Sequence, residues 1–207
     1  MDYSTRSCVA LAAFALLALV PAAARADDEK NSYIVVKGGP YFPTATNAFD
    51  ISGSEVFTWP TAYTIEGGIG ANWGLLGLQL SAGYITTGTS TTTAGQTSAN
   101  AVPILLLVRL RLPIFFVAPY LEGGAGASIA TSTFTAVVNG QGVSNTQVAF
   151  EAVGGAGCDL YFGPILLGAE VRYIWLEPQF TFTGVSTIVQ KLNMSGITLE
   201  AYIGYRF

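Results

Sequence analysis

The sequence predicts an all-β protein, a closed eight-stranded antiparallel up-and-down transmembrane β-barrel. Three observations lead to this prediction. Apolar residues recur at every second position in eight segments, and the joins between those segments are alternately short and long. Charged residues make up only 11% of the chain, against about 25% in ordinary soluble domains, and mean hydropathy is +0.47. The chain is therefore very apolar, and its apolar residues are spaced as in strands.

The last segment shows the pattern most clearly. From Ile197 to Phe207, apolar residues at odd positions alternate with Thr198, Glu200, Tyr202, Gly204 and Arg206. A period of two indicates a strand with one apolar and one polar face. In lipid, every backbone polar group must find its partner within the protein, so a two-faced strand of this length indicates a closed barrel.

Seven earlier segments repeat this alternation along the chain. They cover residues 33–42, 62–71, 76–84, 104–112, 117–129, 148–159 and 167–175. The clearest is the third, where Leu76, Leu78 and Leu80 alternate with glycine, glutamine and serine. Together with the last segment they make eight strands, the even number that single-chain bacterial barrels require.

The joins between the segments differ in length at the two ends. Short joins fall near residues 72–74, 113–115 and 161–164, and long joins near 43–60, 86–100, 130–147 and 177–193. Short turns at one end and long loops at the other are typical of outer-membrane barrels, with the loops outside the cell. The long joins are rich in Ser, Thr, Gly and Asn, and we expect them to be loops.

The N-terminus has the features of a secretory signal. Arg6 is followed by an uncharged run to Ala24 and by the small-x-small site Ala24-Arg25-Ala26. Its most apolar part, residues 8–20, is too short to span a bilayer. We expect residues 1–26 to be a cleaved signal peptide of the Sec type and residues 27–207 to form the barrel. Export without a spanning helix favours the outer membrane of a Gram-negative bacterium.

Composition excludes several other classes of function. Residues 27–207 keep 7 of the 9 basic and 12 of the 13 acidic residues, which leaves no basic patch for nucleic acid. Histidine is absent, which removes Ser-His and Cys-His nucleophile pairs and histidine metal sites. We therefore expect no enzymatic activity and no cofactor. Removal of residues 1–26 takes away Cys8, and we expect the remaining Cys158 to act as a small apolar residue.

Alternation alone does not say which face is inside, since a soluble lipocalin-like barrel is apolar within. The polar faces here carry too few charges to solubilise an exterior. The apolar faces also end in aromatic residues, as membrane interfaces require: Tyr63, Trp73, Tyr84, Trp175, Tyr205 and Phe207. The apolar face is therefore predicted to face lipid. A soluble binding protein remains a third hypothesis, which membrane fractionation tests.

The polar face then places nine charged residues in the lumen: Lys37, Glu66, Arg109, Arg111, Glu122, Glu151, Glu170, Arg172 and Glu200. Buried charges are costly unless they are paired, so we expect a belt of ion pairs. Glu200 is expected to pair with Arg172 and Lys37. The belt either plugs the barrel or gates a narrow path, and Leu105, Leu107 and Ile174 would line an apolar stretch above it.

The chain resembles the eight-stranded outer-membrane β-barrel family, which includes the OmpA membrane domain, OmpX, OmpW and opacity-type surface proteins. The resemblance rests on the eight alternating strands, the join lengths, the lumen Glu and Arg residues, and the ending from Leu199 to Phe207. It implies recognition by the barrel-assembly machinery through Ile203, Tyr205 and Phe207, and contact with outer-membrane lipid and lipopolysaccharide. The sequence names no ligand for the loops.

Two functions follow from this resemblance. The first is a structural or surface-interaction barrel whose lumen is plugged by Glu, Arg and Lys side chains. The alternative, resembling OmpW, is a narrow channel for ions or small apolar molecules.

Overall fold

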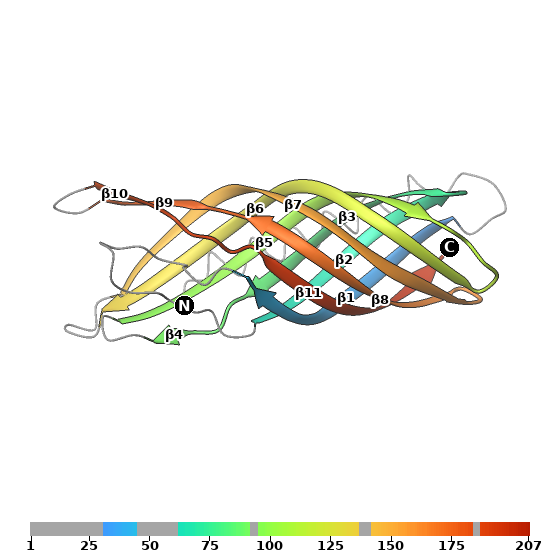
Figure 1. Cartoon of the computed structure of the whole chain (residues 1–207), viewed down its shortest axis with the longest axis horizontal. Coiled ribbons are helices and arrows are strands. Elements are labelled where there is room, and N and C mark those ends of the chain that lie inside the picture. Colours follow the sequence, from blue (N-terminus) through green and yellow to red (C-terminus); the bar gives the residue numbers. More distant parts are fainter. Residues whose placement is uncertain (1–30, 45–61, 92–94, 137–141, 184–186) are drawn as a thin grey trace.

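Eight strands close into a barrel in the computed structural model, which describes residues 31–44, 62–91, 95–136, 142–183 and 187–207. The hydrogen-bonded order is β3-β2-β1-β11-β8-β7-β6-β5, and β3 also pairs with β5, which completes the circle (Figure 1). All the pairings are antiparallel. The predicted fold class, a closed eight-stranded antiparallel barrel, is confirmed. Within the described ranges, no helix is long and apolar enough to cross a membrane.

The eight barrel strands are β1 (Ser32–Pro43), β2 (Ala62–Trp73), β3 (Leu76–Thr86), β5 (Gly95–Arg111), β6 (Val117–Ala136), β7 (Gly142–Phe162), β8 (Ile165–Leu176) and β11 (Gly196–Arg206). Each contains one of the eight alternating segments of the sequence. Three short strands lie beyond the barrel wall: β4 (Ser90–Thr91), β9 (Gln179–Thr183) and β10 (Thr187–Lys191).

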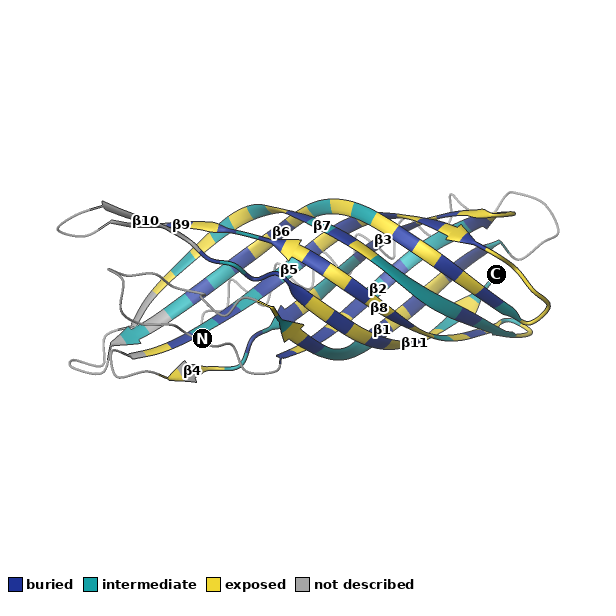
Figure 2. Cartoon of the chain, in the orientation of Figure 1, coloured by how far each residue is buried: buried dark blue, intermediate teal, exposed yellow. Residues whose placement is uncertain are grey.

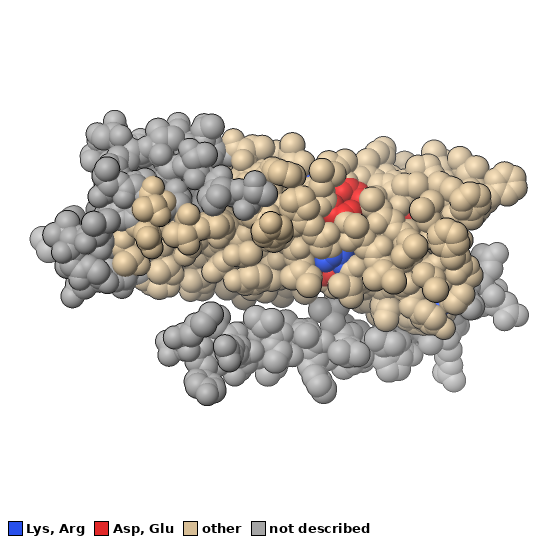
Figure 3. All heavy atoms as spheres, turned by 90° about the horizontal axis from the view of Figure 1, so that it is seen from below, with Lys and Arg blue, Asp and Glu red and all other residues tan. Residues whose placement is uncertain are grey.

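Burial follows the alternation of the sequence, as the alternating buried and exposed bands along the strands show (Figure 2), and the exposed residues are largely apolar. Val36 and Ile203 are 56% and 59% exposed, whereas Lys37, which follows Val36 on the same strand, is 1% exposed. This is the reverse of a water-soluble barrel, since the outer face has aliphatic and aromatic groups that only lipid would solvate well. On the face that Figure 3 shows, the surface is almost entirely uncharged, with acidic and basic residues visible only near the middle of the wall.

The long joins differ from the prediction, because three of the strands, β5, β6 and β7, continue into them. Residues 130–147 were expected to form a loop, but β6 and β7 remain paired from Ala130↔Gln147 to Thr135↔Gly142. The Oγ1 atoms of Thr131 and Thr146 lie 2.9 Å apart across this ribbon. Threonine is a good strand former, but the polar outer face here removes the hydropathy alternation on which the prediction relied.

Two other long joins also contain strands. Residues 95–100, expected to be loop, belong to β5 and pair with β6, while β4 pairs with the start of β5. The join at 177–193 folds into the β9–β10 hairpin. The join at 43–60 lies almost wholly outside the described residues.

The three short turns share one geometry. In each, two residues connect a closing pair: Trp73↔Leu76, Ile114↔Val117 and Phe162↔Ile165. The first of the two residues has a positive φ, which is 61° at Gly74, 61° at Gly163 and 56° at Phe115. Glycine adopts this conformation at no steric cost, whereas in phenylalanine the Cβ atom makes it sterically unfavourable.

Candidate functional site in the lumen

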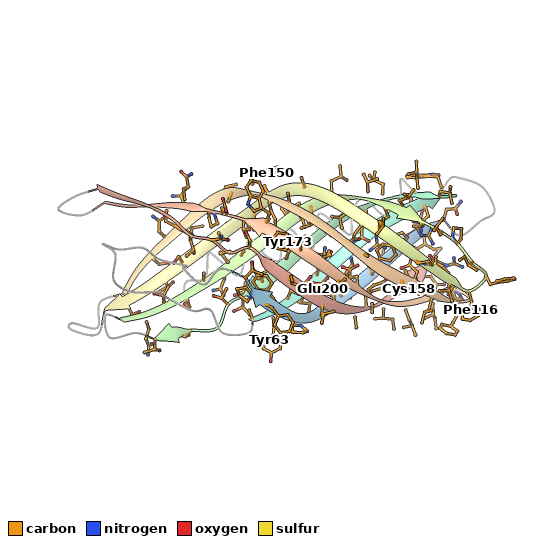
Figure 4. The ribbon with its side chains drawn as sticks, viewed as in Figure 1. Tyr63, Phe116, Phe150, Cys158, Tyr173 and Glu200 are labelled. Atoms are coloured by element: carbon orange, nitrogen blue, oxygen red, sulfur yellow. The ribbon has the colours of Figure 1, made fainter. Side chains whose placement is uncertain are left out.

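Seven charged side chains from six strands meet in the lumen and form what we call the ion-pair belt: Lys37, Glu66, Arg109, Glu122, Glu170, Arg172 and Glu200. All seven residues are at most 6% exposed. They belong to β1, β2, β5, β6, β8 and β11, so the belt reaches across the barrel from wall to wall. Figure 4 shows Glu200 directed into the barrel, whereas Tyr63 and Phe150 point away from it.

Arg172 on β8 is the most highly connected member of the belt. One of its terminal nitrogens lies 2.8 Å from Glu66 Oε2 and also contacts Glu200 Oε2, and its Nε lies 3.0 Å from Glu170 Oε1. Glu122 Oε1 is 3.6 Å from the same Nε. This one guanidinium therefore lies within ion-pair distance of carboxylates from four strands.

Lys37 and Arg109 complete the belt on either side. The Lys37 ammonium lies 2.9 Å from Glu170 Oε1 and 3.6 Å from Glu66 Oε1. Arg109 Nε lies 3.0 Å from Glu122 Oε2, and an Arg109 terminal nitrogen is 3.4 Å from Glu170 Oε2. Glu170 thus contacts all three cations of the belt, and no member lacks a partner of opposite charge.

One expected pair is replaced by another. Glu200 contacts Arg172 as expected, but among the described residues the ion-pair partners of Lys37 are Glu170 and Glu66 and not Glu200. In the strand register Lys37 is opposite Glu66 on one side and Tyr202 on the other, whereas Glu200 is opposite Glu170. The long lysine chain passes the Tyr202 ring, with its ammonium 5.6 Å from the ring centroid, before it reaches Glu170.

A layer of tyrosines lies between the belt and the short turns. Tyr120 donates a hydrogen bond to Glu170 Oε2 at 2.6 Å, and Tyr202 donates to Asp159 Oδ1 at 2.6 Å. Tyr33 donates to the Gln79 side chain at 3.1 Å. This layer also holds Arg111, whose Nε is 3.5 Å from Asp159 Oδ2.

Sequence reasoning did not include this tyrosine layer or Asp159 among the site residues. The signal was present in the alternation. Asp159 has the same parity as Glu151 on β7, and Tyr202 is two residues from Glu200 on β11. Strand parity already placed Tyr120 and Tyr202 on the polar face, but only charged residues were taken as candidate lumen residues.

Glycines on neighbouring strands make room for the rings. The Tyr202 ring occupies the space of a side chain at Gly168, and the Tyr120 hydroxyl end occupies that at Gly157, so a Cβ at either glycine would overlap them. The glycines that alternate with charged residues in these strands therefore serve packing in a narrow lumen, as the small diameter of an eight-stranded barrel demands.

An apolar layer fills the lumen on the long-loop side of the belt. Leu105, Leu107 and Ile174 are at most 3% exposed. They lie in one buried cluster with other residues on the long-loop side of the belt. Other members of that cluster are Tyr41, Ile85, Val153, Leu176, Phe180, Leu192 and Met194. The expected apolar stretch is thus a packed core that also includes residues from the β8–β11 join.

Glu151 is the exception among the nine predicted lumen charges. It is 0% exposed and lies on β7 next in the inward row to Val153, a member of the apolar cluster. No ion pair to Glu151 is formed within the described part of the chain. A fully buried carboxylate without a cationic partner is costly and is rarely retained without a reason.

The three residues of the predicted assembly signal lie at the end of β11. Ile203 and Tyr205 are 59% and 51% exposed on the outer face. Phe207 is half-buried, and its backbone N–H donates to the Ser32 carbonyl at 2.9 Å, which ties the chain end to β1. The predicted interface aromatics Tyr63, Trp73, Tyr84 and Trp175 also have outward, exposed rings.

A family comparison identifies the fold. Residues 10–207 match a family model described as an outer membrane protein beta-barrel domain. The chain belongs to this family. An outer membrane protein beta-barrel domain resides in the bacterial outer membrane, and the predicted localisation is therefore confirmed.

Solved outer-membrane barrels have the same fold. Neisserial surface protein A has a TM-score of 0.52 at 11% identity, with 86% of this chain and 98% of that chain covered. Ail, the attachment invasion locus protein of Yersinia pestis, has a TM-score of 0.51 at 15% identity, with 86% and 100% covered. A major outer membrane protein from Thermus thermophilus has a TM-score of 0.55 at 11% identity, with 85% and 99% covered. The comparison with curated protein sequences finds no match.

Proposed function

We propose that this outer-membrane barrel has a structural or surface-interaction role and that the ion-pair belt plugs its lumen. The observation that carries the proposal is the closure of the belt by mutual pairing. Seven charged side chains, each at most 6% exposed, contact one another across the whole lumen. Apolar side chains fill the space on one side of the belt and tyrosines fill it on the other, as suits a barrel only wide enough for its own side chains.

The proposed orientation places the three two-residue turns in the periplasm and the long joins outside the cell. The paired extensions of β5, β6 and β7 then rise above the membrane and present hydroxyl groups, including those of Thr131, Thr133 and Thr146. A surface role would use this uncharged ribbon. In this scheme residues 1–26 are removed on export, and the assembly machinery recognises Ile203, Tyr205 and Phe207.

The charge distribution bears on the kind of external partner. Ail has been crystallised with sucrose octasulfate, a heparin analogue, and such a polyanion needs exposed basic groups. Here Lys37, Arg109, Arg111 and Arg172 are buried in the lumen and Arg206 lies at the short-turn end. On the long-loop side, the described ranges contain one basic residue, Lys191 on β10. We therefore propose a neutral, hydrogen-bonding partner and not a sulfated one.

Neither the lumen nor the outer wall supports catalysis. The chain has no histidine, and the carboxylates of Glu170 and Glu200 are buried in ion pairs where no substrate reaches them. We propose that the protein is not an enzyme and that its constant partners are outer-membrane phospholipid and lipopolysaccharide.

A narrow channel for ions or small apolar molecules is the alternative, and one observation favours it. Among the described residues the lumen buries six acidic and four basic side chains, so its formal charge is negative. The excess includes Glu151, which has no ion-pair partner within the described ranges and lies beyond the belt on the long-loop side. A conducting lumen of this kind would favour cations.

Planar-bilayer recordings of the refolded protein separate the two functions. A plugged barrel gives no discrete openings, and Arg109→Ala and Glu122→Ala should stay silent as well, because the apolar and tyrosine layers on either side of the belt still fill the lumen. Arg206→Ala, at the short-turn end, is the matched control and should stay silent. Regular cation-selective openings of the unmodified protein that disappear in Arg109→Ala or Glu122→Ala would refute the plug and support the channel.

A further inference from the structure

The turn between β5 and β6 departs from its two counterparts at one residue. The turns after β2 and β7 place glycine at the position of positive φ, namely Gly74 and Gly163. The turn after β5 places Phe115 there, with φ 56° and a side chain 98% exposed. A large side chain rarely adopts this backbone conformation, and glycine would form the same turn without strain.

The fold itself does not require this phenylalanine. Its ring contacts almost nothing in the protein, since nearly all of its surface is accessible. A residue that strains the backbone and packs against nothing within the barrel needs a contact outside it to be favourable. The remaining question is which surroundings accept an aromatic ring at this point.

The lipid-facing outer face of β5 continues without a break into the turn that holds Phe115. Along this face the side chains are apolar and exposed from strand to tip: Leu106, Val108, Leu110, Leu112, Ile114 and Phe116 are 50%, 51%, 51%, 57%, 56% and 60% exposed. Residues 112–119 contain no charged residue. The lipid-facing surface of the barrel therefore extends directly onto the tip.

Strand length places the tip at the edge of the hydrocarbon. The outer face of β5 is apolar from Val102 to Ile114. At about 3.3 Å per residue and a tilt of about 40°, this stretch rises roughly 30 Å, slightly more than the apolar band of about 25 Å on such barrels. The ring of Phe115 then lies at the boundary between acyl chains and headgroups. Figure 1 shows this turn reaching beyond the β7–β8 turn at the same end, and Figure 4 places Phe116 there.

We propose that Ile114, Phe115 and Phe116 form a membrane anchor that inserts into the phospholipid leaflet at the short-turn end. The occupant of this surface is phospholipid, at the level where aromatic rings are favoured. The anchor fixes the depth of the β5–β6 hairpin in the bilayer, and the lipid contact offsets the strain at Phe115. The proposal rests on the outer-membrane location and on the proposed orientation of the barrel, and it is independent of the plug and of the surface role.

Substitution of Phe115 gives a test in which the sign of the effect decides. Phe115→Gly removes the strain and the ring together, and Phe115→Trp keeps an aromatic ring. Urea unfolding in phospholipid vesicles should show that Phe115→Gly lowers the folding equilibrium constant, by roughly tenfold or about 1.4 kcal/mol, while Phe115→Trp stays near the original protein. An increase in the folding equilibrium constant for Phe115→Gly would overturn the proposal, because only strain relief would then remain.

Fluorescence quenching tests whether lipid is the partner. The Phe115→Trp protein is reconstituted in vesicles whose acyl chains carry bromine close to the headgroup, and its emission is compared with that of the unmodified protein. The added tryptophan should be quenched there and less so by bromine near the terminal methyl. Ser144→Trp, on the exposed β7 extension, is the control and should not be quenched. An unquenched tryptophan at position 115 would refute the lipid anchor and direct the search to a periplasmic protein.

Discussion

Replacement of Arg172 by methionine tests the ion-pair belt at its centre. Arg172 contacts four carboxylates, and three of these keep another cation when it is lost. Glu66 and Glu170 retain Lys37, and Glu122 retains Arg109. Glu200 differs, since Arg172 is its sole ion-pair partner among the described residues. Arg172→Met therefore leaves the buried Glu200 carboxylate without a cationic partner. The other three carboxylates lose one of their cationic partners.

The size of the effect follows from burial and distance. Two unit charges 3 Å apart attract by roughly 5 kcal/mol at an effective dielectric constant of about 20, and desolvation cancels much of this gain. Removing one partner of a buried pair typically costs about 3–5 kcal/mol, because the other charge stays buried alone. With Glu200 only 2% exposed, we expect Arg172→Met to lower the free energy of unfolding by about 3–5 kcal/mol.

Urea unfolding of the refolded protein in vesicles, followed by tryptophan fluorescence, measures this change. Arg206→Met is the matched control. Arg206 lies at the end of β11 and donates one hydrogen bond to the Gly163 carbonyl at 3.1 Å, so its loss should cost less than about 1 kcal/mol.

A second substitution tests whether Glu200 is the carboxylate left without a cationic partner. Glu200→Gln in the Arg172→Met background should recover part of the lost stability, and the double-mutant cycle should give a coupling of about 1–3 kcal/mol. A loss below about 1 kcal/mol for Arg172→Met, or no recovery in the double variant, would refute the idea that the belt is held by pairing of buried charges.

Three further predictions concern other parts of the chain. Glu151→Gln should raise the free energy of unfolding by about 1 kcal/mol or more in the same urea assay, because it removes a buried charge that has no cationic partner within the described ranges. Glu122→Gln should lower the free energy of unfolding, because it weakens a paired charge. A change of the same sign in both variants would contradict this interpretation of the two sites. Deletion of Phe207 should reduce the amount of protein in the outer-membrane fraction through failed assembly, and Phe207→Tyr should restore it; normal levels of the deletion variant would disprove the assembly role. Mass spectrometry of the protein isolated from outer membranes should find Asp27 as the first residue, and a retained N-terminus would show that residues 1–26 are not a cleaved signal.

The barrel could be predicted from the sequence because a membrane strand must satisfy a simple alternation. Outward residues such as Leu76 and Ile203 face lipid, and inward ones such as Glu200 do not, so each strand carries its own two-face signal. The same parity places the nine predicted charges inside. The prediction from hydropathy alternation failed at the long joins. There Thr131 and Thr146 continue the strands with a polar outer face, so the alternation of hydropathy is lost.

The contacts within the lumen could not be predicted from alternation alone. Parity places Lys37 and Glu200 on the inner face of adjacent strands, but the lysine chain is long and its ammonium reaches Glu170 across β11. Parity also places Tyr120 and Tyr202 on the inner face, but it does not predict their hydrogen bonds to Glu170 and Asp159. Their place inside depends on glycines of the neighbouring strand, such as Gly168, which become neighbours only through the register.

The sequence by itself determined that eight two-faced strands form a closed barrel in a membrane, because lipid demands an apolar outer face and complete internal hydrogen bonding of the backbone. The tertiary structure alone decided which buried charges meet, that Glu151 stands apart from them, and that Phe115 takes a conformation suited to glycine. The physical reason is that alternation is a local property of one strand, whereas pairing in a lumen depends on register, side-chain length and the closure of eight strands around one axis.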